Sequence, residues 1–284
     1  MPNARSARSW GAEETPRRQV RTLGQGSLKG RASLKLAAVD SAPSRPGLRE
    51  PLLTFFGATL LAAALSLAGR FVPFLSRHLS LLIAAIFLYA PALAGRWSGR
   101  GFDYREAGLR LDPLGLNLRV LGIALAVTFP LFAAAFFIFY GVVCGPHGGL
   151  IQPFFAALCP HWRGLAHGGL RLPPDFFTSA LNQLIVVAIP EELFFRGYLM
   201  QRLDQRWPPA RRLLGAAIGP GLLLSSLLFA LGHLLVIPNP QRLAVVFPAL
   251  VFGWMRARTG SIVPGAVFHA LCNLFADVLH TSYF

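Results

Sequence analysis

Long apolar stretches separated by short polar segments occupy most of the chain after residue 50. A transmembrane helix needs about 20 predominantly apolar residues, and stretches close to this length recur along the sequence. They cover residues 51–69, 78–95, 116–144, 176–199, 213–236, 239–255 and 261–283. The pattern predicts an all-α fold, a polytopic membrane helix bundle with about seven transmembrane helices and a range of roughly six to eight, because two stretches are short.

The first 50 residues have a different composition. They hold eight arginines, two lysines and four acidic residues among Ser, Pro, Gly and Ala, without a sustained apolar period. Such a segment cannot bury enough apolar surface to order itself. We therefore expect a disordered basic N-terminal tail (1–50), N-terminal transmembrane helices with their loops (51–175) and a C-terminal membrane domain (176–284). Whether the tail is a targeting segment stays open.

The composition supports a membrane protein, and the positions of the basic residues indicate which partner the positive net charge has. The chain is 54% hydrophobic and 14% charged, its mean hydropathy is +0.52, and its formal net charge is +15. The arginines lie mostly between apolar stretches, and no basic patch interleaved with aromatic residues occurs, which argues against nucleic-acid binding. The lipid bilayer is therefore the expected partner of this charge.

The distribution of loop arginines predicts an orientation. The tail and the loops after the second, fourth and sixth apolar stretches are richer in arginine than the alternate loops. The positive-inside rule then places the N-terminus in the cytoplasm and the C-terminus outside. The excess of arginine over lysine loosely suggests a bacterial protein from a high-GC genome, hence the bacterial inner (cytoplasmic) membrane.

The longest connection, residues 145–175, contains residues that could suggest a metal site. Five metal-type side chains lie in or beside it: Cys144, His147, Cys159, His161 and His167. Their spacing matches no standard zinc pattern, so we expect a flexible polar loop. A Cys144–Cys159 disulfide would fit a loop on the extracytoplasmic side.

Charged residues inside the fourth apolar stretch are the strongest chemical signal. Residues 176–199, FFTSALNQLIVVAIPEELFFRGYL, contain two adjacent glutamates and an arginine, and each such charge at mid-bilayer costs about 2.5–3.5 kcal/mol. Glu192 and Arg196 are four apart with Glu first, the favoured order for an ion pair along one helical face. Glu191 lies about 100° round the helix and is the predicted working carboxylate. Pro190 just before it predicts a kink or a restart of the helix.

Two later apolar stretches add imidazoles and a carboxamide. His233 lies in SSLLFALGHLL, while His269 and Asn273 in VPGAVFHALCN are four apart and share one helical face. A carboxylate and a neutral imidazole could together deprotonate water for attack on a carbonyl, and the second imidazole and the carboxamide could stabilise an oxyanion.

Each group also has a simpler reading. A Glu–Arg pair can be a structural clamp, a histidine near a helix end can reach for the interface, and a His–Asn pair can join helices by hydrogen bonds. The simple readings must hold independently on three helices, which favours a joint site. The sequence contains no GxSxG nucleophile elbow and no cysteine in a recognisable catalytic motif.

Three motifs resemble those of a known family. EELFFR (191–196) looks like EExxxR, FALGH (229–233) like FxxxH and HALCN (269–273) like HxxxN. These are the motifs of the CPBP family, the membrane-embedded type II CAAX prenyl endopeptidases and bacteriocin-processing or self-immunity proteins. They occur in family order over about the last third of the chain.

The resemblance implies a glutamic intramembrane endopeptidase that acts without a cofactor on a membrane-tethered protein or peptide. In this family the first glutamate and first histidine activate water, and the second histidine and the asparagine hold the oxyanion. The implied catalytic residues are Glu191, His233, His269 and Asn273, with Glu192 and Arg196 as structural companions. Zinc remains a minority idea because the sequence lacks HExxH.

Substrate and rival functions stay open at this point. PEELFFRGYL is also similar to bacterial, myxosortase-like members that trim C-terminal sorting tags of surface proteins, and this is the leading substrate prediction. CAAX-type or bacteriocin-related processing is the alternative. A non-enzymatic protein, either a proton-coupled transporter or a scaffold, is the rival class. Transporters often show two similar halves, whereas the polar groups here are confined to the C-terminal part.

Overall fold

A computed structural model of the chain describes residues 47–145, 149, 155, 158–164 and 169–284. The predicted tail therefore lies almost entirely outside the described residues, as do His147 and His167. The first helix takes up Arg49 and Glu50, the last two residues assigned to that tail.

Helices dominate the described part of the chain, which confirms the all-α bundle. The longer elements are α1 (Arg49–Gly69), α2 (Pro73–Trp97), α3 (Leu114–Val143), α8 (Pro220–Val236), α9 (Val246–Thr259) and α10 (Val263–Tyr283). Each of the seven predicted apolar stretches contains helix. By length and composition α1, α2, α3 and α10 can cross a membrane, and α8 is a shorter apolar helix.

The fourth apolar stretch forms one helical element whose hydrogen-bond pattern changes along its length. Its segments are α5 (Phe176–Asn182), the π-helical η3 (Gln183–Ala188), α6 (Ile189–Glu192), the π-helical η4 (Leu193–Met200) and α7 (Gln201–Arg206). Pro190 stands in the first turn of α6, and the backbone on either side of it stays helical. Wider π turns thus flank the proline where a kink or restart was predicted. Such turns inside helices occur frequently at functional sites.

Two predicted stretches have different starts in the structure. Residues 211–218 form an antiparallel hairpin of β1 (Arg211–Leu213) and β2 (Ala216–Ile218), so the predicted helix at 213 begins only at Pro220. The stretch predicted at 239–255 starts with the 3₁₀ turn η5 (Pro240–Val245) and is α-helical only from Val246. The Asn239 side chain accepts from the Gln241 N–H and caps η5.

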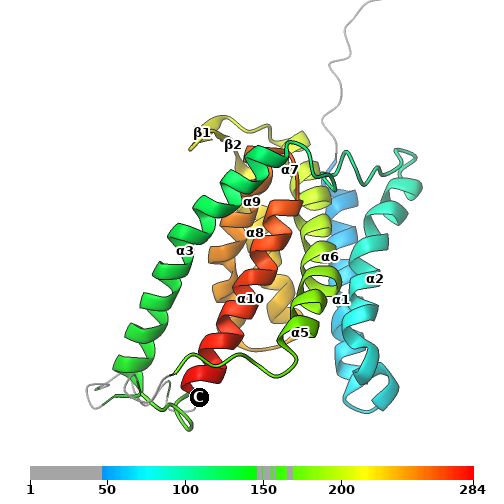
Figure 1. Cartoon of the computed structure of the whole chain (residues 1–284). Coiled ribbons are helices and arrows are strands. Elements are labelled where there is room, and N and C mark those ends of the chain that lie inside the picture. Colours follow the sequence, from blue (N-terminus) through cyan, green and yellow to red (C-terminus); the bar gives the residue numbers. More distant parts are fainter. Residues whose placement is uncertain (1–46, 146–148, 150–154, 156–157, 165–168) are drawn as a thin grey trace, which may run out of the picture. The chain divides into compact units, whose positions relative to one another are not determined.

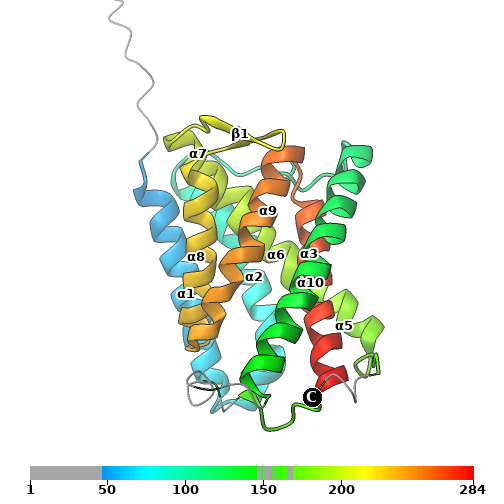
Figure 2. The same ribbon diagram turned by 90° about the vertical axis from the view of Figure 1, so that its left-hand side faces the viewer.

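The helical element α5–α7 lies at the centre of the bundle (Figures 1 and 2). It contacts α2 on one side and α8, α9 and α10 on the other, while α1 packs between α2 and α8. Helix α3 lies outside, against α9 and α10. The central element that carries α6 is therefore surrounded by four other helices, α2, α8, α9 and α10.

The arginine-rich connections gather at one end of the bundle. Figures 1 and 2 show the start of α1, the α2–α3 connection, the hairpin and the end of α9 at that end, and the C-terminus with the end of α3 at the other. Glu50 at the start of α1 pairs there with Arg100 at 3.1 Å and Arg202 at 3.5 Å. Arginine-rich connections at one end are what the alternation of arginine-rich and arginine-poor loops predicts. That this end faces the cytoplasm stays a prediction.

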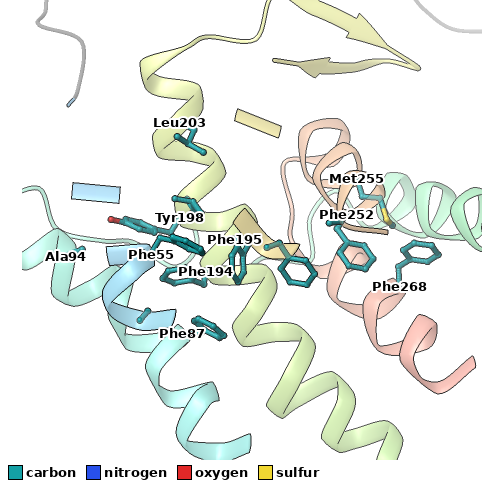
Figure 3. Packing of buried hydrophobic residues seen from close by; sticks show 14 of the residues in the cluster. Phe55, Phe87, Ala94, Phe194, Phe195, Tyr198, Leu203, Phe252, Met255 and Phe268 are labelled. Carbon is teal, nitrogen blue, oxygen red and sulfur yellow. The ribbon is translucent and has the colours of Figure 1, made fainter. Parts of the chain in front are cut away.

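Aromatic rings fix the central element to its neighbours. The ring centroid of Phe194 lies 5.0 Å from that of Phe87 on α2, and that of Phe195 lies 4.9 Å from Phe229 on α8. Figure 3 shows this row of rings continuing to Phe252 on α9. Edge-to-face and tilted aromatic pairs add about 0.5–1.5 kcal/mol each beyond area burial. The two phenylalanines of EELFFR thus hold the adjacent glutamates at a fixed depth and orientation.

Glycines allow two close approaches beside the site. A Cβ on Gly197 would stand 2.8 Å from the Ala107 carbonyl oxygen, and one on Gly253 would stand 2.9 Å from Leu222 Cγ. Both distances are below ordinary van der Waals contact. Gly197 therefore lets the α2–α3 connection rest on η4, and Gly253 lets α9 pack directly on α8.

Cys144 and Cys159 form a disulfide with an S–S distance of 1.99 Å. The bond joins the end of α3 to the segment that follows it. Trp162 in this segment stacks on Tyr140 at 5.2 Å, and the Arg163 N–H donates to the Tyr283 carbonyl oxygen. The disulfide and these contacts hold the connection against the C-terminal end of α10.

Removing this disulfide should lower stability measurably. A loop with a sequence separation of 15 corresponds to about 3 kcal/mol of unfolded-state entropy in the chain-entropy model. We expect the Cys144→Ser/Cys159→Ser variant to unfold at a lower temperature in detergent. Reductant should shift wild type to the same temperature and leave the variant unchanged. A wild-type melting curve that ignores reductant would show that the bond contributes nothing.

Candidate active site

The Glu191 carboxylate faces two imidazoles from two other helices. Its Oε2 atom lies 3.9 Å from His233 Nε2 on α8 and 3.9 Å from His269 Nε2 on α10. This oxygen is buried and has no hydrogen-bond partner among the described residues. A separation of 3.9 Å exceeds a direct hydrogen bond but is one that a bridging water or a substrate oxygen can span. The structure thus brings together three side chains predicted from separate apolar stretches.

A backbone contact sets the proton arrangement of His233. Its Nδ1 lies 3.0 Å from the Phe229 carbonyl oxygen, one turn earlier on α8. A carbonyl oxygen can only accept, so Nδ1 carries the hydrogen. In the neutral ring, Nε2 is then the acceptor, and Nε2 is the atom that faces Glu191.

Glu192 and Arg196 form the predicted ion pair beneath this group. Arg196 Nη1 donates to Glu192 Oε1 at 2.8 Å, and the two side chains are 0% and 1% exposed. Arg196 Nη2 also donates to the Ala249 carbonyl oxygen at 3.1 Å. The same Glu192 oxygen lies 3.2 Å from His269 Nδ1. The pair therefore orients the second imidazole as well as neutralising its own charges.

Two phenylalanines enclose the Arg196 guanidinium. Its Cζ lies 4.4 Å from the centre of the Phe229 ring and 5.0 Å from that of Phe252. Such cation–π contacts are worth about 2 kcal/mol when desolvated. The His269 ring stacks on Phe252 at 4.8 Å and 16°. Phe229, the first residue of FALGH, thus packs on the arginine of the first motif.

Asn273 is in a different position from the other predicted residues. It stands one turn beyond His269 on α10, and its Nδ2 donates to Gln183 Oε1 on η3 at 2.9 Å. Among the described residues it has no hydrogen bond to Glu191 or to either imidazole. The structure therefore pairs it with Gln183 rather than placing it directly on the carboxylate.

Sequence reasoning missed Gln183 and Phe252. Gln183 is a polar residue within an apolar stretch, two turns before Glu191, and that feature could have indicated it. Phe252 belongs to no motif and is one of many aromatic residues in an apolar helix. Nothing in the sequence distinguishes it.

A small cavity adjoins the Glu191 carboxylate, and neither His233 nor His269 is among its lining residues. Its volume is about 120 Å³, and it lies between α2 and the η3–α6 segment. Ile83, Phe87 and Val187 are among its apolar lining residues, and Ser80 and Glu191 are its polar ones. The cavity therefore leaves room for a small group close to the Glu191 carboxylate.

Within the residues that the structure describes, no group of three or more His, Cys, Asp or Glu side chains is arranged to hold a metal ion. His161 is described, whereas two of the histidines weighed for a loop metal site are not. The expectation that the reaction needs no cofactor remains a prediction.

These features define a class of protein. Helices long enough to cross a bilayer surround a buried carboxylate, two imidazoles and a neutralised ion pair, which is the arrangement of an integral membrane protein with an embedded polar site. Residues 173–275 match the family model of Type II CAAX prenyl endopeptidase Rce1-like proteins.

This match covers all three motifs and confirms the resemblance to the CPBP family. Residues 173–275 are therefore similar to the Rce1-like, type II CAAX prenyl endopeptidases. The match does not distinguish the myxosortase-like branch. No curated protein and no solved structure matches the chain.

Proposed function

We propose that the protein is a glutamic intramembrane endopeptidase that hydrolyses a peptide bond of a membrane-tethered protein. The observation that carries the proposal is the position of Glu191 Oε2, buried and 3.9 Å from the Nε2 atoms of both His233 and His269. A water molecule or carbonyl oxygen placed there would contact a base and a hydrogen-bond donor at once.

Water activation falls to Glu191 and His233. Nε2 of His233 accepts from a bound water while its Nδ1–H stays on the Phe229 carbonyl, and Glu191 takes the proton as the water oxygen bonds to the carbonyl carbon. The C–N bond then breaks, and Glu191 returns the proton to the leaving nitrogen. One water is consumed, and one carboxyl group and one amine are formed.

Stabilisation of the oxyanion falls to His269 and Asn273. Donation from His269 Nε2 requires that both ring nitrogens carry hydrogens, because Nδ1 faces the Glu192 carboxylate, and the charged ring then lies between the Glu191 and Glu192 carboxylates. One Nδ2–H of Asn273 is held by Gln183, which leaves the second free for substrate. Hydrogen-bond donors of this kind act on the charge that develops in the transition state.

Replacing Asn273 with alanine should therefore lower kcat by about 10²–10³-fold, the loss typical of one oxyanion donor, with little change in KM. The measurement is steady-state cleavage of a fluorogenic, membrane-tethered peptide in detergent micelles. Asn182→Ala, which removes an exposed carboxamide next to Gln183, is the matched control and should keep wild-type kinetics. An unchanged kcat in Asn273→Ala would remove this residue from the mechanism.

For the substrate, we propose C-terminal sorting tags of surface proteins, on the likeness of PEELFFRGYL to myxosortase-like members. CAAX-type processing is the second candidate, favoured by the description of the matching family. Mass spectrometry of membrane-protein termini, compared between a deletion strain and one carrying Glu191→Ala, decides between them. Proteins left uncleaved in both strains identify the substrate class, and identical termini in wild type and both strains would refute a processing role.

We also propose a bacterial inner-membrane location with a cytoplasmic N-terminus. Two separate features support this orientation. The arginine-rich connections lie at one end of the bundle, and the Cys144–Cys159 disulfide lies at the other. Arginine-rich loops favour the cytoplasm, whereas disulfides persist in oxidising compartments.

A further inference from the structure

A second hollow, which we call the Arg256 hollow, lies at the arginine-rich end of the bundle. Its volume is about 420 Å³, and it is bordered by η4, α7, the hairpin and the end of α9. Its polar lining consists of Arg196, Gln201, Asp204, Gln205 and Arg256. Only Arg196 is shared with the site described above. The hollow is therefore a separate space on the far side of that arginine.

Buried polar atoms in this hollow lack partners. Arg196 Nε, Arg256 Nε and Asp204 Oδ1 are buried and make no hydrogen bond to the described residues. Leaving a buried donor or acceptor unsatisfied costs about 1–3 kcal/mol, and more when the group is charged. Nearly all such atoms in folded proteins have a partner. The hollow thus offers two guanidinium donors and one carboxylate acceptor to a ligand.

The Arg256 guanidinium lies beside a second guanidinium, that of Arg110, which also pairs with Asp112 at 4.0 Å. Arg110 approaches Arg256 beside Gly260, where a Cβ would stand 2.8 Å from Arg110 Nη2 and 3.9 Å from Arg256 Nη1. Two guanidinium groups this close repel each other. An anion between or beside them would remove the repulsion, which favours an anionic ligand.

The Asp204 carboxylate gives the Arg256 hollow a preference for a cation as well. Its Oδ1 lies against Gly221 in the first turn of α8, whose positive end favours a carboxylate. Burial raises the pKa of Asp204 to about 6, and Arg256 acts in the opposite direction. A cation held beside Asp204 would favour its ionised form further. A ligand that satisfies the whole hollow therefore carries both an anion and a cation with N–H donors.

We propose that the Arg256 hollow binds the phosphate and primary ammonium of a phosphoethanolamine group, supplied by a membrane phospholipid. The Arg196 and Arg256 guanidinium groups donate to the phosphate oxygens, and Asp204 accepts from the ammonium. The hollow lies at the end of the bundle where head groups are found, and basic pockets between transmembrane helices at this level bind lipid head groups. This role does not rest on the proposed proteolysis, although the two sites share Arg196.

Competitive lipid retention tests the proposal. The full chain is reconstituted in nanodiscs with equal amounts of phosphatidylethanolamine, phosphatidylcholine and phosphatidylglycerol of the same acyl chains, and lipids retained after detergent extraction are counted by native mass spectrometry. Phosphatidylethanolamine should be retained over phosphatidylcholine, whose quaternary amine cannot donate, by roughly tenfold, the value of one charge-assisted hydrogen bond. Equal retention of the three lipids would overturn the proposal.

Variants test the ammonium contact and the phosphate contacts separately. Asp204→Asn should lose the preference for phosphatidylethanolamine over phosphatidylglycerol, and Arg256→Gln should lose retention of both. Arg212→Gln removes an exposed arginine on β1, outside the hollow, and should behave as wild type. If Arg256→Gln does not fold, Ala217→Trp, which fills the hollow from an exposed position, takes its place. Undiminished retention in Arg256→Gln or in Ala217→Trp would overturn the proposal.

A second experiment with soluble compounds tests whether the phosphoethanolamine group comes from a lipid. Phosphoethanolamine and inorganic phosphate are added separately to delipidated protein in detergent, and the melting temperature is recorded. Phosphatidylethanolamine should raise it more than either soluble compound. An equal rise with soluble phosphoethanolamine, or with phosphate alone, would overturn the assignment to a lipid.

Discussion

Replacing Glu191 with glutamine should abolish peptide hydrolysis while leaving the protein folded. Glutamine keeps the shape of the side chain but cannot take a proton from water. Loss of a positioned general base typically costs about 10²–10⁴-fold in rate. The measurement is kcat/KM on a membrane-tethered fluorogenic peptide, with the melting temperature recorded in parallel.

Glu106→Gln is the matched control for this variant. Glu106 is an exposed carboxylate in the α2–α3 connection, so its replacement should leave kcat/KM unchanged. Cleavage by Glu191→Gln at the wild-type rate would mean that another group activates the nucleophile, and the proposed protease mechanism would fail.

Replacing Arg196 with methionine should have the largest effect on stability. The guanidinium and the Glu192 carboxylate are both almost completely buried and lie 2.8 Å apart. Removing one partner leaves an uncompensated buried charge, which costs about 3–5 kcal/mol. The variant also loses the contacts of the guanidinium with the rings of Phe229 and Phe252. We expect a large fall in the free energy of unfolding, measured by denaturant titration in micelles.

A double variant distinguishes the charge effect from the packing effect. Adding Glu192→Gln to Arg196→Met removes the stranded charge and should recover part of the lost stability. Arg242→Met, at an exposed position in η5, should change the free energy of unfolding little. A double variant less stable than Arg196→Met alone would contradict the account of Glu192 as an ionised partner.

The sequence predicted the bundle because the signal for a membrane span is coarse. A run of about 20 apolar residues can satisfy its backbone in lipid only as a helix or in a closed barrel, so the seven stretches predicted the helices well. The hairpin at 211–218 was missed because its residues from Leu213 onward are as apolar as those that follow. Its turn depends on Leu214 at φ 49° and Gly215 at φ 79°, and a non-glycine residue at positive φ leaves no sequence signal.

The candidate site was predictable only where a costly polar residue type occurs in an apolar stretch at a helical spacing from another. Charge in an apolar stretch is costly enough to identify Glu191, Glu192 and Arg196 by itself. The spacing of His269 and Asn273 predicted a shared helical face but gave no partner. That Asn273 pairs with Gln183 depends on how η3 packs on α10, which is a tertiary property.

The most direct test of the central claim is hydrolysis of a membrane-tethered peptide in ¹⁸O-labelled water by purified wild type and Glu191→Gln, analysed by mass spectrometry of the products. If Glu191 activates a water molecule between His233 and His269, the new C-terminus of the wild-type product carries the label and the variant forms no such product. Labelled product from Glu191→Gln at the wild-type rate would contradict the claim.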